Sequence, residues 1–127
     1  MDREIMKFKA LLWLMAIMYR RAARNNLKMK GYLDKVDNSI LFTTDAETTN
    51  RLFVFKDQQV QTSTKSTESA GMTVRFSTDK VGFNTLWAMA TGKDKNAFMK
   101  AIQDKAVKIE GDMMLLMWFQ KSVKYIR

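Results

Sequence analysis

The chain has 127 residues, of which 46% are hydrophobic and 28% are charged, and its formal net charge is +9 at pH 7. This balance is that of a single globular domain with a hydrophobic core. The sequence contains no histidine and no cysteine. That absence excludes serine–histidine and cysteine–histidine nucleophile pairs, zinc fingers, histidine-ligated metals, redox dithiols and disulfides.

The first predicted element is a helix from about Arg3 to Met29, within a leading segment 1–30 that lacks glycine and proline. Gly31 is expected to end it. Its centre, ALLWLMAIMY (residues 10–19), is apolar on every side. Ten helical residues span only about 15 Å, too short to cross a bilayer. Packing in the core or in a homodimer is favoured, and a membrane-surface anchor or an export signal are the alternatives.

The same segment carries most of the net positive charge, because residues 1–35 contain nine Lys/Arg and three Asp/Glu. The basic cluster consists of five residues: Arg20, Arg21, Arg24, Lys28 and Lys30. Such a cluster favours an anionic partner, and we expect it to contact an acidic membrane surface. A basic nucleic-acid-binding module is an alternative. We expect no nucleic acid, since the aromatic residues lie in apolar runs and not between the cations.

From residue 31 to 77 the pattern changes from helical to strand-like. Four β-branched or aromatic stretches are separated by short polar loops: residues 39–44 (SILFTT), 51–56 (RLFVFK), 60–65 (VQTSTK) and 72–77 (MTVRFS). The last of them alternates strictly between apolar and polar residues. Together they predict an antiparallel β-meander.

A helix is predicted directly after the meander. Thr78 can cap its first turn, and Asp79 stands where the helix dipole favours a negative charge. Its apolar face has the spacing i, i+3, i+4, i+7 and consists of Phe83, Leu86, Trp87 and Ala90. Gly92 is expected to end it.

The rest of the region 78–127 predicts a short helix, one strand and a terminal helix. Asp94 is expected to cap the short helix, and residues 106–110 form the strand. Gly111-Asp112 breaks that strand and can cap a last helix that runs to about Tyr125. In it the seven residues 113–119 are all apolar. We expect one side to pack on the sheet and the other to line a cavity or meet a partner.

Three stretches in this order resemble the sterol carrier protein-2 family of lipid-binding and lipid-transfer domains: LWAMATGK (residues 86–93), AFMKAI (97–102) and VKIEGDM (107–113). The resemblance implies an α+β fold, with a mixed, mainly antiparallel sheet of about five strands covered by helices. It also implies an apolar tunnel between sheet and helices for acyl, isoprenoid or sterol-like chains. The whole chain, residues 1–127, is expected to be one such domain.

Two groups of residues are candidates for the lipid site. Three share a face of the terminal helix: Met114, Met117 and Trp118. Five come from the two preceding helices: Phe83, Leu86, Trp87, Phe98 and Ile102. Burial of a methylene is worth about 0.8 kcal/mol, and methionine, of which there are eleven, repacks readily around varied chains. The alternative is that these apolar stripes form a solid core.

The expected function is non-catalytic binding, and transfer, of a hydrophobic lipid. An accessory role is the alternative: presentation of a lipid intermediate to enzymes of a membrane pathway such as quinone biosynthesis. We expect no metal and no cofactor. Glu110 and Asp112 are the one close carboxylate pair at a place that suggests catalysis, but an exposed strand charge and a helix cap explain them better. The expected location is the cytoplasm, with peripheral attachment to a membrane.

Overall fold

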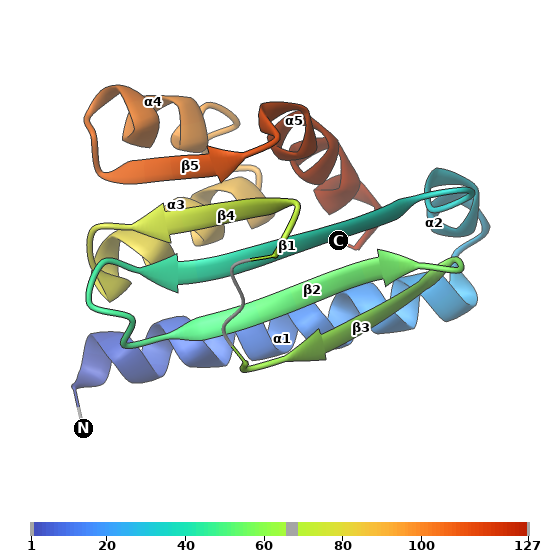
Figure 1. Ribbon diagram of the computed structural model, residues 1–127, viewed down its shortest axis with the longest axis horizontal. Helices are drawn as coiled ribbons and strands as arrows, with labels where there is room; N and C mark the ends of the chain where they lie inside the picture. Colours follow the sequence, from blue (N-terminus) through green and yellow to red (C-terminus); the bar gives the residue numbers. More distant parts are fainter. Residues whose placement is uncertain (1, 66–68, 127) are drawn as a thin grey trace.

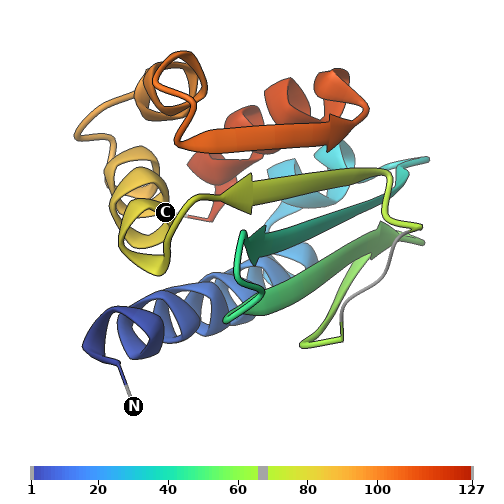
Figure 2. The ribbon, with the colours of Figure 1, turned by 60° about the vertical axis from the view of Figure 1, so that its left-hand side comes forward.

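The computed structural model describes residues 2–65 and 69–126. Five strands form one sheet in the order β3-β2-β1-β4-β5. Their bounds are β1 (Asp37–Thr44), β2 (Asn50–Lys56), β3 (Gln59–Ser63), β4 (Met72–Phe76) and β5 (Val107–Gly111). The helices are α1 (Arg3–Asn25), α2 (Leu27–Tyr32), α3 (Asp79–Ala90), α4 (Ala97–Gln103) and α5 (Met113–Ser122), followed by the short 3-10 turn η1 (Val123–Tyr125). The long helix α1 lies behind β2 and β3, and α3 and α5 cover the same face further up (Figures 1 and 2).

The sheet is mixed and mainly antiparallel, as expected. β1, β2 and β3 pair antiparallel, and β5 is antiparallel to β4. β4, however, pairs parallel to β1, with Ile40 opposite Met72 and Thr44 opposite Phe76. The prediction that β4 continues the antiparallel meander was therefore wrong. Alternation of polar and apolar residues determines which face a side chain occupies, but it does not select the neighbouring strand.

The leading helix is shorter than predicted. It ends at Asn25, because Asn26 takes an extended conformation (φ −108°, ψ 113°) and its side-chain oxygen accepts hydrogen bonds from the backbone N–H of Lys28 and Met29. The break therefore starts a second helix, α2, in which Gly31 is an internal residue. The Asn26 side chain also donates to the carbonyl of Tyr125 at 3.2 Å. Side-chain capping of this kind competes with a continuous helix.

The core lies between the sheet and the helices and is rich in aromatic rings. The largest aromatic side chains with essentially no exposure are Phe8, Tyr19, Phe42, Phe53, Phe55, Phe76, Phe98 and Phe119. α1 approaches α3 closely where the ring of Phe8 lies over Gly82. A Cβ atom built on Gly82 would stand 2.5 Å from Phe8 Cζ, so this contact requires glycine.

Several predicted helix ends are confirmed. Thr78 Oγ1 accepts from the N–H of Val81 at 3.2 Å, and Asp112 Oδ1 accepts from that of Met114 at 2.9 Å. Gly92, with φ 74°, follows α3 as predicted. The prediction for Asp94 was wrong, since the residue before α4 is Asn96 and makes no side-chain cap. Asp94 instead accepts from the N–H of Asn96 and pairs with Lys100.

Candidate functional site

The space between the sheet and the helices, where the resemblance implied a tunnel, is occupied by aromatic side chains. The Tyr19 ring lies 5.9 Å from that of Phe119 and 5.7 Å from that of Phe55. Phe42 lies 5.1 Å from Phe119 and 5.5 Å from Phe53. Close packing of this kind fills the interior between these rings.

Most of the eight predicted lipid-site residues are part of that packing. Leu86 and Phe98 are completely buried. Phe83, Ile102 and Trp118 are half-buried against the core. Trp118 lies between two other rings, those of Tyr32 and Phe55, at 5.2 and 4.8 Å.

Two of the predicted residues lie on the outside of α5. Leu115, Leu116 and Phe119 turn toward the core, whereas the three methionines of the apolar run are exposed. Met114 is 73% exposed and Met117 is 50% exposed. The structure thus does not bring the eight residues around one cavity.

A groove with mainly apolar walls lies instead between α1, α3 and the C-terminal end of the described chain. Its volume is about 440 Å³, within the range of ligand sites in proteins. We call it the apolar groove, and it is lined by Leu11, Leu14, Met15, Met18, Trp87, Ala90, Thr91 and Ile126. Trp87 is the one predicted residue among them. Its ring stacks on Phe83 at 5.7 Å, which in turn carries the Lys7 ammonium at 4.5 Å.

The α1 side of this groove was not predicted from the sequence. A signal was present, because Leu11, Leu14, Met15 and Met18 have the spacing i, i+3, i+4, i+7. It was hidden because the centre of α1 is apolar on every side. That centre has three apolar surfaces: one in the core, one along the groove, and an outer one formed by Trp13, Leu14 and Ile17.

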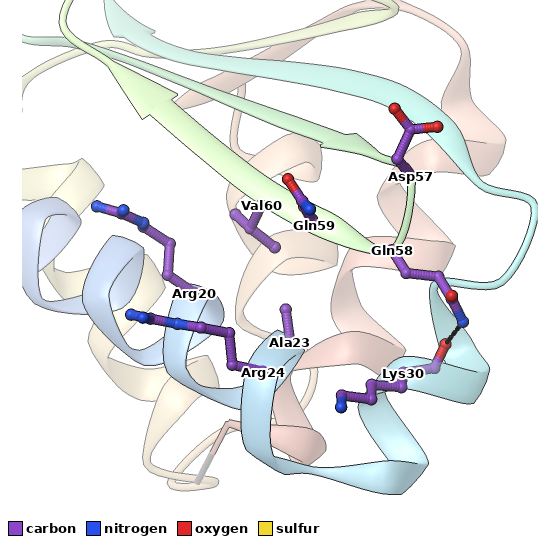
Figure 3. Close-up of a pocket in the computed structure, with 8 residues that line it drawn as sticks. All are labelled: Arg20, Ala23, Arg24, Lys30, Asp57, Gln58, Gln59 and Val60. Atoms are coloured by element: carbon purple, nitrogen blue, oxygen red, sulfur yellow. Dashed lines mark hydrogen bonds between the residues drawn. The ribbon is translucent and has the colours of Figure 1, made fainter.

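The structure brings three of the five predicted basic residues together. Arg20 and Arg24 of α1 and Lys30 of α2 line a hollow of about 460 Å³, which we call the basic concavity (Figure 3). Its other lining residues are Ala23, Asp57, Gln58, Gln59 and Val60.

The other two cations do not line the basic concavity. Arg21 lines a second hollow on the outer side of α1, which it shares with Arg20 and Arg24. Lys28 is exposed on α2.

The carboxylates have structural partners. Glu110 accepts from Arg75 Nε at 3.2 Å, and Asp112 caps α5. Asp79 is buried and accepts hydrogen bonds of 2.5 Å from the hydroxyls of Thr48 and Thr49. No group of three or more acidic side chains able to hold a metal occurs among residues 2–65 and 69–126.

No helix within the described part of the chain combines the length and the apolar character needed to span a membrane.

Helices packed on one face of a mixed sheet, with an apolar groove at the edge of the core, define a small α+β domain. The profile of the SCP-2 sterol transfer family matches residues 19–124. The chain belongs to this family, which groups lipid-binding domains. Comparison with curated proteins gives no significant match.

Solved structures share the fold at low sequence identity. The ubiquinone synthesis protein UbiJ-SCP2 superposes with a TM-score of 0.66 at 13% identity, over 94% of this chain and 95% of that one. Sterol carrier protein domain 2 of Helicoverpa armigera gives 0.63 at 16% identity, with coverages of 91% and 87%. Sterol carrier protein-2 of Aedes aegypti, solved with the C16 fatty acid palmitate, gives 0.51 at 14% identity and covers both chains fully.

Proposed function

We propose that the protein binds, without catalysing a reaction, a lipid whose hydrocarbon chain lies in the apolar groove. The observation that carries this proposal is the groove itself, since seven of its eight lining residues are apolar. Burial of a chain there is worth about 0.8 kcal/mol per methylene that leaves water. The groove is open, so only part of the chain is covered, and ordering of the chain lowers the affinity further. Met15 and Met18 can adapt to different chains.

The position of Arg21 favours a lipid with an anionic head group. On a helix, residues three and four apart are neighbours, so Arg21 lies one turn beyond Met18 on the flank that carries Leu14. It is exposed and could meet the carboxylate of a fatty acid whose tail lies along the groove. Such an exposed ion pair adds about 0.2–1 kcal/mol.

Binding of palmitate, followed by the emission of Trp87, tests this proposal. In a background with Trp13 and Trp118 replaced by phenylalanine, Trp87 is the single tryptophan. We expect Leu14→Asp, which places a charge in the groove at a partly exposed position, to lower the affinity at least tenfold. The control is Met114→Asp, at an apolar and more exposed position on α5, and it should bind normally. Loss of binding in Met114→Asp alone would favour the site predicted from the sequence and overturn the groove.

A second proposal concerns transfer, which requires contact with a membrane. The outer surface of α1 carries exposed Trp13 and Ile17, and Arg20, Arg21 and Arg24 follow it on the next turns. Amphipathic helices with tryptophan and flanking cations lie in the interface of acidic bilayers. Flotation with vesicles tests it. Trp13→Asp should reduce recovery on acidic vesicles, whereas Met114→Asp should not. Equal recovery of both variants would contradict the proposal.

A homodimer through the first helix would use the same outer surface of α1. Sedimentation of the purified protein distinguishes the two partners. A dimer that Trp13→Asp converts to monomer would assign this surface to a second copy of the chain.

The accessory role in a pathway such as quinone biosynthesis uses the same groove and differs in the ligand. At 13% identity the similarity to UbiJ-SCP2 shows a common fold, so the ligand has to be identified directly. Native mass spectrometry followed by organic extraction decides between them. An isoprenoid quinone precursor would favour the accessory role, and a mixture of fatty acids would favour general lipid binding. Binding to oligonucleotides with a steep salt dependence would favour the nucleic-acid alternative.

A further inference from the structure

The basic concavity and the apolar groove lie on different flanks of α1. Successive residues of a helix are rotated by about 100°, so Arg20 is about 200° away from Met18 around the axis. Arg24 follows Arg20 by one turn and lines the same hollow. Figure 3 shows both guanidinium groups on the side of α1 that faces the β2–β3 hairpin, with Lys30 to their lower right, near Gln58. The concavity is therefore a separate site and not the end of the groove.

In the described part of the chain, no ion pair involves the three cations of the basic concavity. The ion pairs within residues 2–65 and 69–126 are Arg75–Glu110 and Lys100–Asp94. Asp57 belongs to the lining, but its carboxylate points away from both arginines (Figure 3). Three like charges around one hollow repel one another unless an anion binds between them. The arrangement favours an anion of high charge over a single carboxylate.

The wall opposite α1 contains a hairpin turn with an unusual residue at its second position. Asp57 and Gln58 form the turn between β2 and β3, with φ of 56° and 57°. Such turns favour Asn-Gly or Asp-Gly, because a glutamine at positive φ is strained. Gln58 Nε2 donates to the carbonyl of Lys30 at 3.0 Å, which fixes the hairpin to α2. Strained residues of this kind are concentrated at functional sites.

Phosphate groups match this set of donors. Two guanidinium groups one turn apart can each form paired hydrogen bonds to phosphate oxygens, and a lysine ammonium adds a point charge. A phosphate monoester carries about −1.5 to −2 charges near neutral pH. The volume of about 460 Å³ exceeds that of one phosphate, which leaves room for a diphosphate or for the group that the phosphate esterifies. Ala23 and Val60 provide an apolar floor for it.

We propose that the basic concavity binds a phosphomonoester or diphosphate group through Arg20, Arg24 and Lys30. The group can belong to the head of an acidic lipid or to a soluble phosphorylated molecule. The proposal concerns a second site and does not depend on the lipid in the apolar groove.

Calorimetric titration with inorganic pyrophosphate at fixed ionic strength tests the site. We expect saturable binding that Arg20→Gln/Arg24→Gln weakens at least tenfold. The matched control is Lys9→Gln/Lys28→Gln, which removes the same charge from α1 and α2 at exposed positions outside the concavity. It should change the affinity less than twofold. Equal losses in both variants would show that the net charge, and not the concavity, determines the affinity. This result would overturn the proposal, and so would binding that does not saturate.

Vesicles then identify the source of the phosphate. If pyrophosphate releases the protein from vesicles that contain phosphatidic acid, the site takes a lipid head group. If pyrophosphate binds but leaves recovery on these vesicles unchanged, the site takes a soluble phosphorylated molecule. Pyrophosphate binding should be unaltered in Leu14→Asp. If the unmodified protein binds pyrophosphate but not palmitate, the function proposed for the groove is contradicted and this site stands.

Discussion

The hydroxyl of Tyr19 on α1 lies 2.6 Å from the hydroxyl of Ser122 at the end of α5, and both side chains are fully buried. Ser122 also bonds to the carbonyl of Phe119 at 2.6 Å, where it must be the donor. Tyr19 therefore donates to Ser122. Burial raises the pKa of the Tyr19 hydroxyl far above its usual value, so the group stays neutral in this position. The pair joins the first and last α-helices inside the aromatic core.

The two hydroxyls should differ in their effect on stability. Ser122→Ala leaves the buried Tyr19 hydroxyl without an acceptor, and we expect a loss of about 1–3 kcal/mol in the free energy of unfolding. Tyr19→Phe leaves Ser122 bonded to Phe119 and should cost about 0.5–1.5 kcal/mol. Urea denaturation measures both. The double variant should be no less stable than Ser122→Ala, and additive losses would contradict this account.

The close approach of α1 and α3 gives a second prediction. Gly82→Ala should destabilise the protein by about 1–3 kcal/mol, because the new methyl group overlaps the Phe8 ring. Gly31→Ala is the control, since nothing lies within 4 Å of a Cβ atom at that position of α2. It should stabilise by up to about 1 kcal/mol through helix propensity. Phe8→Leu replaces the ring with a smaller side chain, so Gly82→Ala should cost less stability in that background.

The β2–β3 turn allows the strain and the tether to be separated. Asp57→Gly should change the stability little, because aspartate tolerates a positive φ. Gln58→Gly relieves the strain of a glutamine at positive φ, worth about 1 kcal/mol, but it also removes the hydrogen bond to the carbonyl of Lys30, so the two effects should nearly cancel. Thermal unfolding measures both variants. A gain of about 1 kcal/mol or more from Gln58→Gly would show that the bond does not hold the hairpin.

The ion pair of α4 predicts a pH dependence. The hydrogen bond from Lys100 holds the pKa of Asp94 below its usual value. A carboxyl with a lowered pKa contributes stability above its unfolded pKa and loses it as the pH falls through the folded one. Lys100→Gln should raise the pKa of Asp94, which NMR titration of the carboxyl carbon detects. An unchanged titration would contradict the bond. The exposed pair should have little influence on unfolding.

Local features of the fold could be predicted from the sequence, because short-range chemistry determines them. Thr78 and Asp112 cap helices through bonds to residues two or three positions away. Gly111 has φ 101°, and a Cβ atom there would lie 2.5 Å from the carbonyl oxygen of Gly71. The strand therefore ends where the Gly-Asp pair indicated.

Features that depend on distant partners could not be predicted. The break at Asn26 is stabilised in part by a bond to Tyr125, 99 residues away. The apolar groove also depends on residues that are far apart in the sequence. Trp87 was assigned correctly to an apolar face, but the opposite wall of the groove comes from α1. The apolar run of α5 has core residues on one side and exposed methionines on the other. Its composition alone could not show whether its side chains line a pocket, fill the core or face outward.

The parallel pairing of β1 and β4 also affects how the chain can fold during synthesis. The first three strands can form as hairpins once residue 63 has left the ribosome, yet the outer edge of β1 has no partner until residues 72–76 emerge. An uncovered edge of this kind recruits other strands. Completion of the sheet also requires contacts between residues far apart in the chain, which slows folding. The newly made protein therefore passes through a stage in which aggregation competes with completion of the sheet.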